Sequence, residues 1–197
     1  MQTTYENLKS GDPMELVKKT QLSKKEKLKI IFKSLFSFHF IESIVSSFAY
    51  YLFEYVYWKF DITTKGVYRV HATTSIRNAK NISLGFDTRI TTNCIIWAGK
   101  TSKITIGDNV LIGPGVQLHA SNHGYKLGKG PMTYQTRVEK DIIIGNDVWI
   151  GGNSVITAGV SLADGIIVAA GSTVTKSFAE KNIIIGGVPA KKISERV

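Results

Sequence analysis

Cysteine is almost absent from this 197-residue sequence, since Cys94 is the single example. One cysteine can form neither a disulfide within the chain nor a cysteine cage for a metal, and such usage is typical of proteins from a reducing compartment. The amino-terminal stretch MQTTYENLKSGDPMEL is polar and partly acidic, unlike a secretory signal peptide. These features predict a cytoplasmic protein without disulfides.

Long apolar runs are also missing. Residues 18 to 58 repeat apolar side chains at helical spacing, which predicts an α-helical segment; the repeating residues are Ile41, Ile44, Val45, Phe48, Leu52 and Val56. Glu42 and Glu54 limit the longest uncharged run here to 11 residues. A membrane-spanning helix needs about 20 predominantly apolar residues, so the sequence predicts no such helix.

The helical region, taken as residues 1–65, has two interpretations. Its stretch KKTQLSKKEKLKIIFK holds seven lysines and precedes an aromatic-rich segment. One interpretation is a helix, or a hairpin of two, that packs on the rest of the protein or on a neighbouring subunit. The other is a basic amphipathic segment in peripheral contact with the inner, anionic face of a membrane.

Acidic residues are scarce relative to basic ones. The chain has 15 acidic and 25 basic residues, for a net charge of +10. This excess favours an anionic partner, such as a phosphorylated cofactor or a membrane surface. We expect no nucleic acid partner, because neither a basic recognition helix nor an aromatic RNA-binding motif is present.

What the sequence does contain, from residue 66 onward, is a repeat of six. Large aliphatic residues recur at every sixth position in three sets, and the sets are Leu84, Ile90, Ile96; Ile106, Ile112, Leu118; and Ile144, Ile150, Ile156, Leu162, Val168, Val174. A small residue follows most of them, and then a turn pair such as Asp108-Asn109 or Gly152-Asn153. Helices and plain strands have other periods.

Each hexapeptide therefore reads as a short strand and a corner with one aliphatic side chain pointing inward. The turn pairs suit corners because Gly and Asn tolerate positive φ. Stacked units of this kind form a parallel β-helix with coils about 4.8 Å apart, and several coils are needed to bury the core. The predicted fold is mainly β, a parallel β-helix preceded by an α-helical segment.

These repeats resemble the hexapeptide-repeat acyltransferases over residues 66–192, with 193–197 left as a tail. The segments that carry the resemblance are ITIGDNVLIGPGVQLHASNHGY, IIIGNDVWIGGNSVITAGV, AAGSTVTKS and GGVPAKKI, and they are most similar to galactoside, maltose, nodulation-factor and surface-polysaccharide O-acetyltransferases. The resemblance implies a left-handed coil with three hexapeptides per turn, a homotrimer with active sites between subunits, acetyl-CoA as co-substrate and a sugar hydroxyl as acceptor.

The count of six breaks at residues 119–142, which we predict to form a protruding loop. Insertions that leave a regular scaffold are common places for binding groups. His123, in SNHGY, matches the catalytic histidine of the resembled family, and an imidazole can take the proton from a sugar hydroxyl as it attacks. By the same resemblance we expect His123 to be the general base of direct acetyl transfer.

Other residues are candidates for acceptor contacts. His119 replaces the small residue of its hexapeptide, Asn122 replaces an aliphatic or Ser, and Tyr125 belongs to a polar, basic set in the loop. Asn93 lies 30 residues before His123, which matches a substrate-contacting asparagine of the galactoside-type enzymes; a plain turn residue is the alternative. Thr101 falls where those enzymes carry a substrate-binding aspartate. This difference argues against galactoside itself as the acceptor.

The resemblance also implies a binding surface for CoA. Trp149, at the corner of its hexapeptide, should point outward against the CoA arm, and Gly152 and Ala170 should allow close approach of the pantetheine. A hydroxyl and positive charges for the phosphates would come from a further set: Thr175, Lys176, Lys191 and Lys192.

Other classes of function remain as alternatives. A zinc enzyme needs about three protein ligands, and His119 and His123 have no third histidine between residues 72 and 118, so we expect no metal. A purely structural β-helix would not need the interruption at residue 119. Among acetyltransferases, acetylation of a surface polysaccharide or its lipid-linked precursor ranks before N-acetylation of a nucleotide-linked amino sugar and acetylation of an antibiotic.

Overall fold

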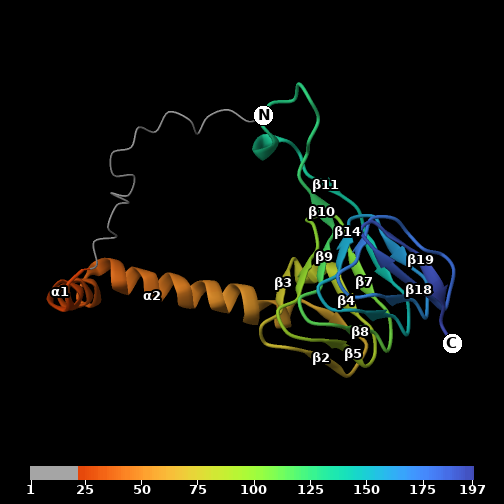
Figure 1. Ribbon diagram of the computed structural model, residues 1–197, viewed down its shortest axis with the longest axis horizontal. Helices are drawn as coiled ribbons and strands as arrows, with labels where there is room; N and C mark the ends of the chain where they lie inside the picture. The colour runs from red at the N-terminus through yellow and green to blue at the C-terminus, as the bar shows by residue number, and fades with distance from the viewer. Residues whose placement is uncertain (1–21) are drawn as a thin grey trace, which may run out of the picture. The chain divides into compact units, whose positions relative to one another are not determined.

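The computed structural model describes residues 22–197. They fall into two compact units, one ending at Phe48 and one beginning at Ala49 (Figure 1). No helix in the described part of the chain is long and apolar enough to cross a membrane.

The first unit is helical. α1 (Lys24–Leu35) begins with a capping box, in which the Ser23 hydroxyl accepts the Glu26 N–H and the Glu26 carboxylate accepts the Ser23 N–H. α2 (Phe38–Tyr51) follows and reaches into the second unit. Neither helix has a buried residue. The helix predicted for residues 18–58 is confirmed from Lys24, with a break at residues 36–37, while residues 18–21 lie outside the described residues.

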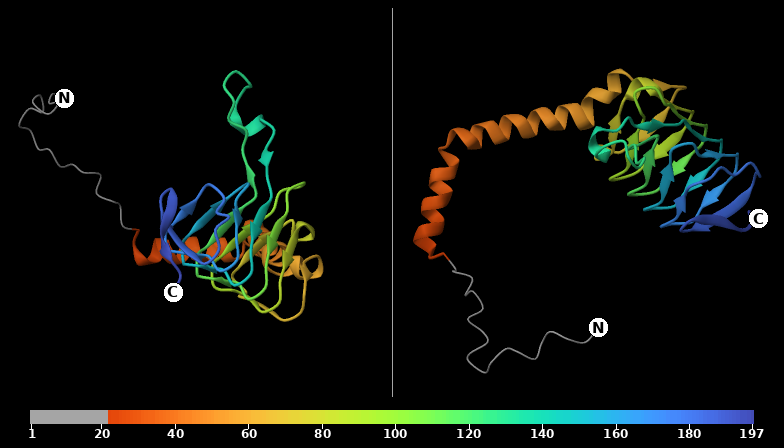
Figure 2. Two further views of the ribbon diagram at one scale, coloured as in Figure 1. Left: turned by 90° about the vertical axis from the view of Figure 1, so that its right-hand side faces the viewer. Right: turned by 90° about the horizontal axis from the view of Figure 1, so that it is seen from above.

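The second unit opens with two short helical turns and then forms the coils. A π-helical turn, η1 (Leu52–Val56), and a 3₁₀ turn, η2 (Tyr57–Phe60), continue from α2. Three sheets then form the three faces of a β-helix, whose stacked coils are seen in Figure 2. Two further 3₁₀ turns, η3 (Ala79–Asn81) and η4 (Met132–Tyr134), lie in connections between strands.

Each sheet is built from strands of successive coils. Sheet A contains, in order, β1 (Thr63–Thr64), β4 (Ile82–Leu84), β7 (Ile104–Ile106), β12 (Ile142–Ile144) and β15 (Ser161–Leu162). Sheet B contains β2 (Tyr68–Val70), β5 (Thr88–Ile90), β8 (Leu111–Ile112), β13 (Trp149–Ile150), β16 (Ile167–Val168), β18 (Ile183–Gly187) and β19 (Ala190–Glu195). Sheet C contains β3 (Ser75–Arg77), β6 (Ile95–Trp97), β9 (Gln117–His119), β14 (Val155–Thr157) and β17 (Thr173–Val174). Within these three sheets all strand pairs are parallel except β18 with β19.

The register confirms the predicted repeat. Ile144 pairs with Leu162, and Ile150 with Val168, so partners lie eighteen residues apart and one turn of the coil takes three hexapeptides. Every aliphatic residue of the three predicted sets is at most 2% exposed. Their side chains form one continuous core along the axis, which supplies the burial that a single coil cannot.

The corners follow the predicted turn chemistry. Left-handed backbone recurs at the second residue of the turn pairs, six positions apart, as at Asp147, Asn153 and Gly159. The small residue before the pair allows the coils to approach. A Cβ on Gly151 would lie 2.6 Å from the backbone N of Ala170 in the next coil.

The departures from six gather at one edge of the β-helix, where sheet C leads into sheet A. Between β14 and β15 this edge needs three residues, but it takes residues 78–81 after β3, 98–103 after β6 and 120–141 after β9. The last of these forms an antiparallel pair, β10 (Ser121–Asn122) with β11 (Val138–Glu139), and protrudes from the coils in Figure 2. We call this the C–A edge; it is where an irregular site can be built on a regular scaffold.

Candidate functional site

Three large side chains lie next to one another on the outer face of sheet C. Arg77 pairs with Trp97, and Trp97 with His119, so the three occupy neighbouring strands about 4.8 Å apart. Each follows an inward aliphatic residue of its strand, the position that most other hexapeptides fill with a small residue. Side chains alternate along a strand, so all three point away from the core.

His119 is held in a fixed orientation within this row. Its Nε2 lies 3.0 Å from Gln117 Oε1, and its ring meets the Trp97 ring edge-on with centroids 5.5 Å apart. The side chain is half-buried, and this burial lowers the pKa of His119 below 6.5. This burial favours the neutral form of the imidazole.

A buried carboxylate from the helical turn η1 supports the row. Glu54 is 1% exposed, and both its oxygens lie 3.1 Å from Arg77 Nε. The Ser75 hydroxyl donates to Glu54, and Trp97 Nε1 donates to Ser75 Oγ at 2.7 Å. The Arg77 guanidinium lies over the Trp97 ring, 3.9 Å from its centroid. Glu54 thus links the start of the second unit to the outer face of sheet C.

His123 faces the same cavity as this row. The cavity has a volume of about 250 Å³. It is lined by Arg77, Asn78, Trp97, Ala98, His119, Ser121, His123 and Arg137. His123 follows β10 directly and is exposed, while Ser121 Oγ is buried without a hydrogen-bond partner among residues 22–197. The structure therefore brings the two predicted histidines together at the C–A edge.

The protruding loop is fastened at its base and at its middle. The Glu139 carboxylate accepts the backbone N–H groups of Lys100, Thr101 and Ser102 and the Thr101 hydroxyl, at 2.6 to 3.2 Å. The Thr101 hydroxyl and these backbone donors lower the pKa of Glu139 to about 2. Further out, the Gln135 side chain bonds Lys126 N, Lys126 O and Gly130 O. Thr101 thus contacts the loop base in this structure.

Three other predicted acceptor residues do not line the histidine cavity. Asn122 is exposed in β10 beside Val138. Tyr125 is 75% exposed and lines a separate hollow of the loop together with Arg137. Asn93 lies at the opposite edge of sheet C, where sheet B leads into it, with the positive φ of a turn residue.

The predicted cofactor residues are distributed over several faces of one chain. Trp149 lies within strand β13 and not at a corner as the sequence suggested. It is 52% exposed between Leu111 and Ile167. Gly152 and Ala170 lie at the edge from sheet B to sheet C.

The remaining cofactor candidates lie elsewhere. Thr175 and Lys176 are exposed at the C–A edge. Lys191 and Lys192 are exposed on β19. The Lys192 ammonium pairs with Glu180 and Glu195, and their carboxylates raise its pKa. This pairing reduces the positive charge that Lys192 offers to a phosphate.

Two observations bear on other chemistries. Cys94 is 1% exposed, its Sγ donates to Gly113 O, and burial raises the pKa of its thiol, so it packs as a small apolar residue. Within residues 22–197 no group of three or more histidine, cysteine or carboxylate side chains gathers around a point where a metal ion could bind.

Sequence reasoning overlooked Arg77, Trp97 and Glu54. For the first two a signal existed, because Ile76-Arg77 and Ile96-Trp97 repeat the anomaly noticed at Leu118-His119, a large residue directly after the inward aliphatic. For Glu54 the only signal was a carboxylate inside an apolar helical stretch. Its partners lie 21 and 23 residues away, and only the coil brings them together.

Comparison with known proteins is consistent with this geometry. A family profile described as "Hexapeptide repeat of succinyl-transferase" matches residues 141–176. Galactoside O-acetyltransferase of Escherichia coli is 43% identical over 94 residues, covering 47% of this chain and 44% of the relative. A putative lipopolysaccharide biosynthesis O-acetyl transferase of the same organism, WbbJ, is 31% identical over 117 residues. The match covers 56% of this chain and 59% of the relative. The chain thus spans about half the length of these curated relatives.

Solved structures extend the likeness. A galactoside acetyltransferase in complex with coenzyme A is 31% identical with a TM-score of 0.61, covering 70% of this chain and 67% of that one. A hexapeptide-repeat acetyltransferase of Vibrio cholerae, complexed with acetyl coenzyme A, is 26% identical with a TM-score of 0.55. The match covers 83% of this chain and 81% of that one. With its repeat, register and histidine cavity, this chain belongs to the hexapeptide-repeat acetyltransferase family.

Proposed function

We propose that the protein transfers the acetyl group of acetyl-CoA to a sugar hydroxyl, with His123 as general base. The observation that carries the proposal is the shared cavity of His123, His119 and Arg77 at the break in the repeat. A lone exposed histidine would carry little weight, but this one shares its cavity with a second imidazole, an arginine and an indole on neighbouring strands. The CoA complexes of similar proteins support the choice of donor.

The proposed reaction is direct transfer in a ternary complex. The acceptor oxygen attacks the thioester carbon, and His123 takes the hydroxyl proton as the new C–O bond forms. The C–S bond then breaks, and CoA leaves as a thiolate. No acyl-enzyme is needed, and the buried Cys94 thiol takes no part. Arg77 and Trp97 shape the acceptor side of the cavity.

Within this activity we propose a surface polysaccharide, or its lipid-linked precursor, as the acceptor. The likeness to an O-acetyl transferase of lipopolysaccharide biosynthesis supports this choice. The amino-terminal helices support it too, because α1 carries five lysines beside exposed apolar residues and α2 is aromatic-rich. Sedimentation with anionic but not with neutral vesicles would be the expected behaviour of a chain that meets its acceptor at a membrane.

The replacement of His123 by alanine tests the chemistry. Loss of a positioned base should lower turnover about 10²- to 10⁴-fold while leaving CoA affinity unchanged. Turnover is measured as CoA release and as the mass shift of the product, with a panel of sugars and glycan fragments. His71→Ala is the matched control, since His71 is an exposed histidine outside the cavity. Near wild-type turnover in His123→Ala would show that another group is the base.

A further inference from the structure

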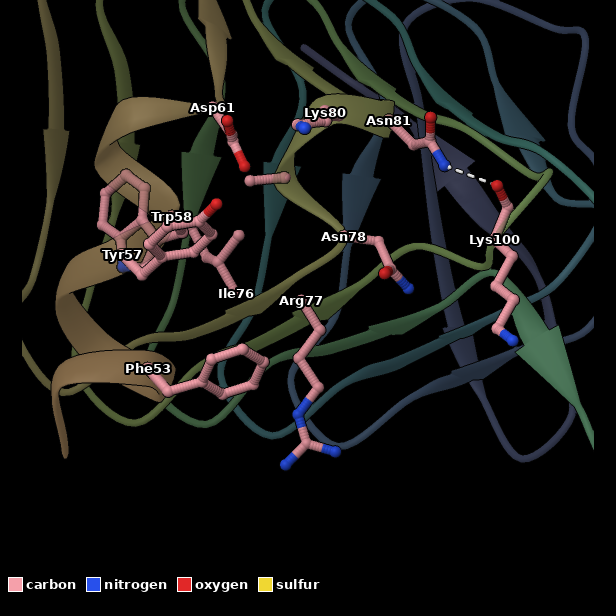
Figure 3. A pocket seen from close by; sticks show the side chains of 11 residues that line it. Phe53, Tyr57, Trp58, Asp61, Ile76, Arg77, Asn78, Lys80, Asn81 and Lys100 are labelled. Carbon is pink, nitrogen blue, oxygen red and sulfur yellow. Dashed lines mark hydrogen bonds between the residues drawn. The ribbon is translucent and has the colours of Figure 1, made fainter. Parts of the chain in front are cut away.

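A second cavity adjoins the histidine cavity. It has a volume of about 540 Å³ and lies between the helical turns η1 and η2 and the C–A edge (Figure 3). The two cavities share Arg77 and Asn78, so a single extended ligand can occupy both. An acceptor monosaccharide beside His123 would leave the larger cavity vacant.

One wall of the second cavity presents aromatic rings. Phe53 and Tyr57 are one helical turn apart, and their rings are parallel to within 10°, with centroids 6.3 Å apart. They are 65% and 52% exposed, so their faces are open to a ligand. Sugar rings expose C–H groups on their flat faces, which pack on aromatic faces. This wall therefore suits a carbohydrate.

The opposite wall presents amide oxygens and cations. The side-chain nitrogens of Asn78 and Asn81 donate to backbone oxygens of residues 98–100, which leaves the Oδ1 atoms to accept hydroxyl groups. Lys80 and Lys100 also line the cavity, and neither forms an ion pair with any described residue. Asp61 supplies the one carboxylate in the lining of this cavity. Two lysines that form no ion pair within residues 22–197 and one carboxylate favour an anionic ligand.

Two residues in the walls of these cavities have a buried side-chain polar atom without a partner among the described residues. Among the described residues, two buried side-chain atoms lack a hydrogen-bond partner, Trp58 Nε1 and Ser121 Oγ. Trp58 lines the second cavity, and Ser121 lines the histidine cavity. Both atoms are buried, so a ligand in the cavities as they stand does not reach them.

We propose that the second cavity is an acceptor subsite for an anionic part of a glycan, one or more sugar units away from the hydroxyl that reacts at His123. This rests on the proposed function and narrows its substrate class to acidic glycans or glycosyl phosphates of at least two units. The sugar ring lies on Phe53 and Tyr57, and its carboxylate or phosphate meets Lys80 and Lys100.

Direct binding to the full-length chain tests the subsite without turnover. The probes are digalacturonate, galactobiose of the same linkage and galactose phosphate, titrated by calorimetry at two salt concentrations. Digalacturonate should bind about tenfold more tightly than galactobiose at low salt, and the advantage should shrink at high salt. Galactose phosphate distinguishes a carboxylate from a phosphate as the bound anion. If it is the only probe that binds tightly, the group that Lys80 and Lys100 contact is a phosphate.

Two double variants locate the site. Lys80→Ala with Lys100→Ala should lower affinity for the anionic probe about tenfold and leave galactobiose nearly unchanged. Phe53→Ala with Tyr57→Ala should weaken both disaccharides about tenfold. Matched controls remove exposed groups outside the cavity, Lys65→Ala with Lys103→Ala for charge and Phe86→Ala for aromatic surface.

The outcomes separate this inference from the proposed function. Equal affinity for acidic and neutral probes, no binding of any anionic probe, or double variants that bind like their controls would overturn the subsite, whatever the acetyl transfer activity. Binding that follows the pattern above in a chain that releases no CoA with any acceptor would sustain the subsite and refute acetyl transfer.

Discussion

At the scale of single residues, the site depends on a carboxylate that does not line the histidine cavity. Glu54 binds Arg77 and Ser75, and through them fixes Trp97, whose ring contacts His119. A buried carboxylate is tolerated only when charged and hydrogen-bonding partners satisfy it. Arg77, by contrast, is 40% exposed in its side chain, so solvent screens part of this pairing.

A double-mutant cycle measures this pairing. We expect Arg77→Met to lower the free energy of unfolding by about 2 kcal/mol, because it leaves the Glu54 carboxylate buried without its cation. Glu54→Gln should cost about 1 kcal/mol, and the double variant less than the sum by about 1 kcal/mol. Urea unfolding at pH 7 gives these values. Arg89→Met, at an exposed pair with Asp87, is the control and should leave the free energy of unfolding nearly unchanged. Additive losses at Glu54 and Arg77 would disprove the coupling.

At the scale of elements, the C–A edge is a set of insertions fastened to one another. The loop after β9 carries His123, and its return strand β11 carries Glu139, which caps the backbone donors of residues 100–102 in the coil before. The loop's place over the histidine cavity thus depends on one carboxylate bound by a neighbouring insertion. Three backbone N–H groups and a hydroxyl keep that carboxylate ionised.

The ionisation of Glu139 predicts the pH range over which the loop stays in place. Its pKa is about 2 in the folded protein, against 4.5 for the unperturbed group. Because the folded-state pKa is depressed, the stabilisation is fully present above pH 4.5 and is lost as the pH falls toward 2. The carboxyl carbon resonance of Glu139 should therefore titrate near 2, well below the 4.5 of an unperturbed glutamate. Titration of Glu139 near 4.5 would mean that its hydrogen bonds with residues 100–102 do not form.

Glu139→Gln should release the loop at neutral pH. The amide keeps the shape but not the charge that attracts three donors. We expect trypsin to cleave at Lys126, Lys129 and Arg137 several times faster than in the wild type, while the thermal midpoint of the coils changes little. Glu180→Gln, at an exposed pair with Lys192 far along the chain, is the control.

Much of this element-scale arrangement could be predicted from the sequence, and the limit has a physical cause. The period of six places Ile144 and Ile150 in the core because each coil repeats the same local geometry. The break at His119 marks the site for the same reason, since an exception to a strict rule is visible without a structure. The hydrogen bonds of Glu139 and of Glu54 join partners 21 to 39 residues apart in the sequence. No local pattern determines which segments these carboxylates contact.

At the scale of the whole molecule, one chain holds the proposed base apart from the proposed contacts for the CoA arm and the pantetheine. His123 lies at the C–A edge, Trp149 on the outer face of sheet B and Gly152 at the edge from sheet B to sheet C. Side chains on different faces of a coil cannot converge on one thioester within a chain. Neighbouring chains in a closed cyclic assembly can bring unlike faces together, which is the arrangement that the family resemblance implies.

Mixing two inactive variants tests whether the site is shared. His123→Ala lacks the proposed base, and Trp149→Ala lacks a proposed cofactor contact, so each alone should assemble with a mass near three chains of 21.7 kDa yet show little turnover. When equal amounts are unfolded together and refolded, about a quarter of the sites in randomly assembled trimers should pair an intact base with an intact neighbouring cofactor surface. Turnover should then recover to about a quarter of the wild-type rate, whereas the two variants refolded separately and mixed should recover none. If base and cofactor surface belonged to the same chain, every site would keep one defect and no mixture would regain activity.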